Sequence, residues 1–199
     1  MRWLTLYLRS RRVPVALATA VGGMVVMWVL GSAVSDGGPG VKMVVLTVLL
    51  LVVVLTATLS GPDEELDRTA ARPWPPRRVS HLLAALAVVA GLPFLTHLTG
   101  ISFGPAGPVI RDAAGLLGLA ALSAPLLGAG RAWFVPLGWT LAAAVYPAAG
   151  HLLGEILTWQ SQAADSTPAA VTAAVLAGSG LIAYASAGPA RRTPAEAAL

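Results

Sequence analysis

Long apolar runs separated by short polar or Gly/Pro-rich connections set the pattern of this sequence. Six of the runs are close to the roughly 20 residues that an α-helix needs to cross the hydrocarbon core of a membrane. The pattern therefore predicts an all-α, polytopic membrane protein with about six transmembrane helices in a single transmembrane domain, residues 1–190. The expected spans are residues 13–34, 41–60, 79–98, 113–130, 132–153 and 169–187, followed by a cytoplasmic tail, 191–199.

The boundary between the fourth and fifth runs is open to two interpretations. Only Arg131 separates them, and Gly128, Gly130 and Pro136 lie close by. Gly and Pro of this kind favour a turn. The two runs are therefore either separate spans or one broken hairpin whose tip stays at the level of the lipid headgroups.

The segment before the first run, residues 1–12, is basic. Arg2, Thr5, Arg9 and Arg12 fall on one stripe of a helix, which is typical of a short amphipathic helix lying in the headgroup layer. A basic segment that only stops transfer is the alternative. A cleaved signal peptide is disfavoured because the first apolar run is longer than the usual apolar region of such a peptide.

The distribution of positive charge predicts the orientation. If the N-terminus is cytoplasmic, all but two of the 13 Lys and Arg residues lie in inner segments, and only Lys42 and Arg111 lie outside. Basic residues accumulate in cytoplasmic connections of membrane proteins. The sequence therefore predicts N-in and C-in, which agrees with an even number of spans.

Composition supports the same class. Only 11% of the residues are charged and 56% are apolar, whereas about 25% are charged in an ordinary soluble domain. The positive charges sit at the ends of apolar runs, so orientation and lipid headgroups explain them better than nucleic acid does. The absence of Cys excludes disulfides and cysteine metal sites.

Small residues recur at four-residue spacing in several runs, as in Ala114/Gly118 and Ala174/Gly178. Such pairs let helix backbones approach closely in a membrane. In a chain with 21 glycines the spacing also arises by chance, so it carries little weight as a sign of oligomers.

Few side chains are placed for catalysis. Lys42 lacks both the glycine loop and the following Ser or Thr of an ATP-binding phosphate loop. The three histidines are not clustered with enough carboxylates to bind a metal ion. We therefore expect no enzyme activity, no bound metal and no directly bound cofactor.

The polar residues expected on the outer side form a candidate cluster. His151 and Glu155 are four residues apart at the outer end of the fifth run, and Arg111-Asp112 opens the fourth. A proton or cation site is one interpretation, because ionisable residues at membrane depth are costly. The other is a set of side chains at headgroup level, with Asp112 favoured by a helix N-terminus.

The longest polar segment is the loop at residues 61–78, which begins GPDEELDRTAARPWPP. Its acidic residues come first and its arginines follow, as a short helix over residues 63–72 favours. Pro73 ends this helix. The helix, the stiff Pro-rich arm and the next span would form a lever, whereas a solvated connector is the alternative.

Two stretches resemble six-span membrane (permease) subunits of bacterial, actinobacterial-type ABC exporters. The first is LDRTAARP with the downstream HLLAAL, and the second is GLLGLAALSAPLLGAGRAWFVPLGWTL, distinguished by Trp133, Pro136 and Trp139. The resemblance does not extend to the segment between the fifth and sixth runs, where no pair of re-entrant half-helices is evident.

The resemblance implies that residues 63–72 are a coupling helix that docks on a separate ABC ATPase subunit. It also implies a second membrane subunit, the same or a homologous chain, with ATP and Mg bound by the ATPase. The expected docking residues are Glu64, Glu65, Leu66, Asp67, Arg68, Thr69 and Arg72.

The expectation is thus a multi-pass exporter subunit in the bacterial cell membrane, with lipid as its surroundings and no nucleic-acid partner. A non-transporting membrane accessory protein, such as an immunity protein, a sensor or an assembly factor, is the alternative.

Overall fold

The computed structural model describes residues 11–34, 39–59, 75–100, 102–146 and 151–190, and in these ranges the chain forms helices and turns without any β-strand. The helices are α2 (Val13–Val34), α3 (Val41–Thr56), α5 (Pro75–Leu95), α6 (Ala106–Leu127), α7 (Phe134–Val145), α8 (Leu152–Leu157) and α9 (Thr167–Ala187), with short 3-10 helices η1 (Thr96–Thr99) and η2 (Trp159–Ser161). The predicted all-α class is confirmed.

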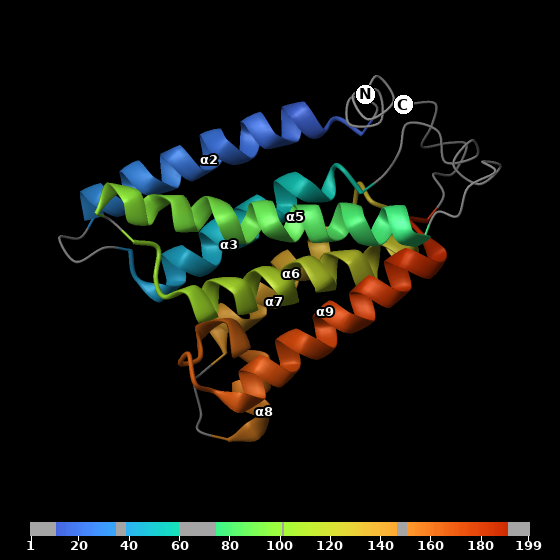
Figure 1. The fold of residues 1–199 in the computed structure, drawn as a ribbon. Coiled ribbons are helices and arrows are strands. Elements are labelled where there is room, and N and C mark those ends of the chain that lie inside the picture. Colours follow the sequence, from blue (N-terminus) through green and yellow to red (C-terminus); the bar gives the residue numbers. More distant parts are fainter. Residues whose placement is uncertain (1–10, 35–38, 60–74, 101, 147–150, 191–199) are drawn as a thin grey trace.

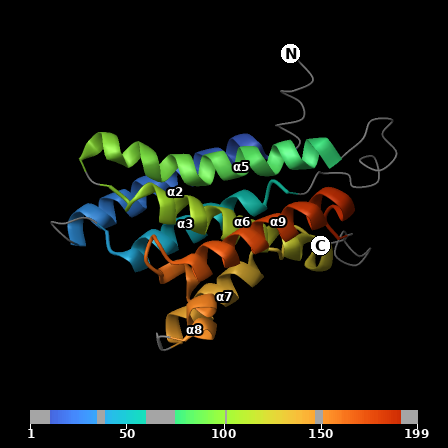
Figure 2. The same cartoon turned by 60° about the horizontal axis from the view of Figure 1, so that its bottom comes forward.

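The long helices lie side by side; α2, α3, α5 and α6 alternate in direction, and α9 runs parallel to α6 because the short helix α7 returns between them (Figure 1). Consequently the start of α2 and the end of α9 lie at the same end of the bundle, where a side chain from each comes into contact. Helix α6 is buried along most of its length, and α3, α5, α7 and α9 all pack against it. In both views α7 and α8 lie on the side of the bundle away from α2 (Figure 2).

Four helices are long and apolar enough to cross a membrane: α2, α5 with η1, α6 and α9. Helices α3 and α7 are also apolar but have only 16 and 12 residues. The outer faces are apolar as well, with Val15 of α2 and Ile182 of α9 strongly exposed. A helical membrane protein accounts for these surfaces. The count of six spans, the N-in/C-in orientation and the interfacial helix at residues 1–12 stay predictions.

The apolar run at 132–153 does not form the single helix that was expected there. Helix α7 ends at Val145, and α8 begins only at Leu152. Tyr146 adopts an extended backbone, with ψ at 129°, as a residue that precedes proline favours. Pro147 in the sequence was the local signal for this break.

Helix α6 begins earlier than the predicted span at 113–130. Its first residue is Ala106, with Pro105 before it in an extended conformation and Pro108 in the first turn, where a missing N–H costs nothing. As a result Arg111 and Asp112 lie inside the helix and not at its entrance. The end is set by Gly128, whose φ of +79° suits glycine.

The turn between α6 and α7 separates the two helices. Ser123 near the end of α6 donates a 2.8 Å hydrogen bond to the carbonyl of Ala132, which fixes the turn against α6. Two helices joined by a turn are compatible with both interpretations, separate spans and a broken hairpin, so the choice between them stays open.

The closest helix contact joins α6 and α9. A Cβ added at Gly118 would lie 2.5 Å from the Cα of Ala177, and one added at Gly180 would collide with the carbonyl group of Gly118. Only glycine therefore permits this approach. Gly118 was singled out in the sequence by its spacing, but Gly178 makes no comparable contact.

Candidate functional site

The predicted docking residues lie outside the described ranges. Glu64, Glu65, Leu66, Asp67, Arg68, Thr69 and Arg72 all fall within 60–74. The structure describes the points at which the chain enters and leaves this segment, Leu59 and Pro75.

A buried set of hydrogen bonds, which we call the Arg11 cluster, surrounds the entry point. It comprises Arg11, Thr58, Leu59, His81 and Tyr184. The Tyr184 hydroxyl donates a 2.6 Å hydrogen bond to the carbonyl of Leu59, and Nη1 of Arg11 donates to the same oxygen at 3.3 Å. Oγ1 of Thr58 and Nε2 of His81 are 3.0 Å apart.

The Arg11 cluster joins four helix ends. Arg11 lies two residues before α2, Leu59 lies just beyond α3, His81 is near the start of α5, and Tyr184 is near the end of α9. Tyr184 is completely buried and Arg11 is only 4% exposed. A buried cation is tolerated when hydrogen-bond acceptors compensate for its lost hydration. The cluster is therefore a structural junction at one end of the bundle.

A second contact at this end involves Arg78. Its Nη1 donates a 3.2 Å hydrogen bond to the carbonyl of Ala185. Gly188 lies directly beneath the guanidinium group, with a φ of +70°. Arg78 thus ties the first turn of α5 to the last turn of α9.

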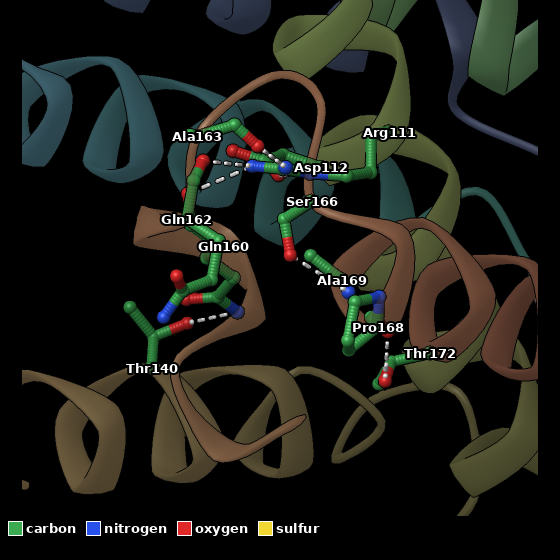
Figure 3. A network of polar contacts seen from close by, with 10 residues as sticks. All are labelled: Arg111, Asp112, Thr140, Gln160, Gln162, Ala163, Ser166, Pro168, Ala169 and Thr172. Atoms are coloured by element: carbon green, nitrogen blue, oxygen red, sulfur yellow. Dashed lines mark hydrogen bonds and ion pairs between the residues drawn. The ribbon is translucent and has the colours of Figure 1, made fainter. Parts of the chain in front are cut away.

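At the opposite end, Arg111 binds three backbone carbonyls and one carboxylate (Figure 3). Nε donates to Oδ1 of Asp112 at 3.0 Å. The terminal nitrogens donate to the carbonyls of Ala163 at 3.0 Å, Gln162 at 3.1 Å and Gln160 at 3.4 Å. We call this arrangement the Arg111 clamp. The planar, multidentate guanidinium suits such a set of acceptors, and the clamp fixes the segment before α9 onto α6.

The segment held by the clamp folds back onto the bundle. The Trp159 side chain is fully buried and lies against Gly115 of α6, where a Cβ would collide with the indole ring. Gln160 donates a 3.1 Å hydrogen bond to Thr140 of α7, and Trp139 donates one to the carbonyl of Leu157. Helices α8 and η2 are therefore packed against α6 and α7.

The candidate outer-side cluster is divided in the structure. Arg111 and Asp112 form the clamp, whereas His151 is an exposed residue at the start of α8, 3.4 Å from the Tyr146 hydroxyl. Glu155 lies in α8, partly exposed. Within the described ranges, no three His or acidic side chains are grouped so as to hold a metal ion. A shared cation site of these four residues is therefore not formed.

A pocket of about 370 Å³ opens beside the Arg111 clamp. Its walls come from residues 39–44, 104–112 and 160–164 and consist largely of Gly, Pro, Val and Ala. Asp112 and Arg111 are the charged groups of the lining. Because they pair with one another, the pocket has little net charge.

Sequence reasoning missed the roles of Tyr184 and Arg11. Tyr184 is an isolated aromatic residue in a run of Ala, Gly and Ser, and that isolation was the available signal. Arg11 stood among other arginines, so no local feature distinguished it. Its partners are 48 and 173 positions away along the chain.

Comparison of the chain with protein-family models, with characterised proteins and with solved structures finds no match. Membership of a family consequently stays an expectation from the two resembling stretches.

Proposed function

We propose that this chain is the membrane-spanning subunit of an ABC-type exporter in the bacterial cell membrane. It would couple ATP hydrolysis by a separate ATPase subunit to movement of a substrate, together with a second membrane subunit. The observation that carries the proposal is the Arg11 cluster, because it anchors the chain on both sides of the polar segment 60–74.

The anchoring gives a physical route for force. Leu59 precedes the segment, and its carbonyl is bound by both Arg11 and Tyr184. On the other side, the α5 residues Arg78 and His81 contact α9 and the end of α3. A push on residues 63–72 would therefore reach α2, α3, α5 and α9 through short, buried contacts, and such contacts transmit displacement better than a solvated linker does.

The segment between α7 and α9 is where the resemblance does not extend. The resemblance implies a pair of short helical elements there, and the sequence pattern did not reveal them. Helix α8 and η2 are two short helical pieces that contact α9, and η2 also contacts α6.

The ATP chemistry belongs to the partner in this proposal. The chain has no phosphate-loop sequence, and its part is mechanical: it receives displacement at residues 63–72 and changes helix packing. The 370 Å³ pocket beside the Arg111 clamp lies at the end of the bundle opposite to the Arg11 cluster.

Charge reversal tests the docking step. Arg68→Glu and Leu66→Asp are each expected to abolish copurification of an ATPase subunit from the native membrane, while membrane insertion stays unchanged. Asp165→Arg, an exposed charge reversal before α9, is the matched control and should leave copurification intact.

Unchanged copurification with Arg68→Glu would count against docking at residues 63–72. A native complex that contains no ATPase would instead favour the membrane accessory protein. The amount of chain in the membrane fraction, measured for each variant, separates loss of docking from loss of folding.

A further inference from the structure

An apolar groove of about 160 Å³ runs between α5 and α9, with α6 as its floor. An apolar cavity of about 150 Å³ is large enough to hold a molecule the size of benzene, so this groove can take part of a hydrocarbon chain. Leucines of all three helices and small residues of α6 and α9 line the groove, chiefly Leu82, Leu86, Leu181, Gly178, Ala114 and Gly118.

One end of the groove lies under a positive charge. Arg78, Leu82 and Leu86 follow one another at four-residue intervals, so they share one face of α5. On α9, Ala185 lies one turn beyond Leu181, and its carbonyl accepts the hydrogen bond from Arg78. The guanidinium therefore spans the two helices at the point where the leucine-lined groove ends.

The first turn of α5 carries two basic residues. Arg77 precedes Arg78 in the first turn of α5. Neither residues 75–86 nor residues 178–190 contain Asp or Glu. An anionic group placed at Arg78 therefore meets no acidic side chain from the two helices that form the walls.

The surroundings identify the occupant. Helices α5, α6 and α9 are each long and apolar enough to cross a membrane, and Leu83 at the rim of the groove is 53% exposed. Lipid is what such a surface meets in a bilayer, and basic sites between membrane helices bind anionic headgroups. An apolar channel with a cationic end matches an acyl chain joined to a phosphate.

We propose that the α5–α9 groove is a binding site for one anionic phospholipid, with an acyl chain in the groove and the phosphate at Arg78. The bound lipid fills the gap between the two helix walls. The site does not depend on the proposed transport function, since it uses only lipid and this chain.

Two kinds of variant test the site. A Cβ added at Gly178 would meet no atom within 4 Å, so Gly178→Leu can fill the groove without a backbone clash. Ala114→Phe fills it from α6. Gly22→Leu is the matched control, because Gly22 is also open but lies on α2, which does not line the groove. Arg78→Gln keeps a donor for the Ala185 carbonyl and removes the charge.

The measurement is native mass spectrometry of the purified full chain after incubation with phosphatidylglycerol or phosphatidylcholine of identical acyl chains. The wild-type chain should retain one phosphatidylglycerol in preference to phosphatidylcholine. In Arg78→Gln that preference should fall about fivefold, the effect of one basic residue at a membrane surface. Gly178→Leu and Ala114→Phe should lose both lipids, and Gly22→Leu should behave as the wild type.

Equal retention of the two lipids by the wild-type chain would overturn the proposal. So would retention that survives both groove-filling variants, or a loss that Gly22→Leu shares. Thermal unfolding of each variant shows whether Gly178→Leu and Ala114→Phe are folded. Lipid retention by one folded groove-filling variant is sufficient to test the proposal.

Discussion

Tyr184 contributes to the bundle through a single hydroxyl group. The ring is fully buried, and the hydroxyl donates to the carbonyl of Leu59, which also accepts from Arg11. Tyr184→Phe keeps the packing and removes one of the two donors, so we expect a loss of about 1 kcal/mol in unfolding free energy.

The measurement is the midpoint of unfolding of each variant in detergent, with circular dichroism as the signal that reports loss of helix. Tyr146→Phe is the matched control. Tyr146 is partly exposed, and its hydroxyl makes a long, exposed contact of 3.4 Å with His151. Equal midpoints for Tyr184→Phe and Tyr146→Phe would mean that the Tyr184 hydroxyl has no special structural role.

At the scale of the element, the segment before α9 depends on the Arg111 clamp. Lys in place of Arg keeps the charge but loses the planar fork that reaches several carbonyls at once. In Arg111→Lys we therefore expect backbone amides in residues 160–163 to exchange hydrogen about tenfold faster.

Hydrogen-exchange mass spectrometry measures this effect. Arg131→Lys, an exposed position in the turn before α7, serves as the control. Unaltered exchange in Arg111→Lys would show that Trp159 packing, and not the clamp, holds the segment.

Individual elements differ in how far the sequence determines them. The expected last span, 169–187, nearly matches α9, which begins at Thr167, where Ser166 accepts a hydrogen bond from the Ala169 amide and Pro168 occupies the first turn. The end of α7 was less visible, since Tyr146 precedes Pro147 inside an apolar run. The packing of Trp159 on Gly115 was out of reach, because it joins side chains that share no local pattern.

For the molecule as a whole, the expected orientation is N-in and C-in, and it can be tested directly because the chain has no Cys. Ser161 and Ala187 are both exposed and lie near opposite ends of the bundle. In intact cells, Ser161→Cys should react with a membrane-impermeant maleimide, whereas Ala187→Cys should react only after lysis. The reverse pattern would invert the orientation.

The orientation was predicted from charge and the helical class from apolar run length. The long-range junctions were not, because Arg11 meets Tyr184 only when the first and last spans come together. The place of His151 and Glu155 was also not predicted: both were expected at the outer end of the fifth span, but the helix there ends at Val145 and they lie at the start of α8.

The shortness of α7 has a consequence for the surrounding lipid. Its 12 residues rise only about 18 Å, whereas a bilayer core is about 30 Å thick. Its side chains Phe134, Leu141 and Val145 are strongly exposed. If α7 crosses the membrane as one of the expected spans, local thinning of the bilayer would relieve the hydrophobic mismatch on this flank. Helix α7 would then prefer short acyl chains, while α2, across the bundle, suits a membrane of ordinary thickness.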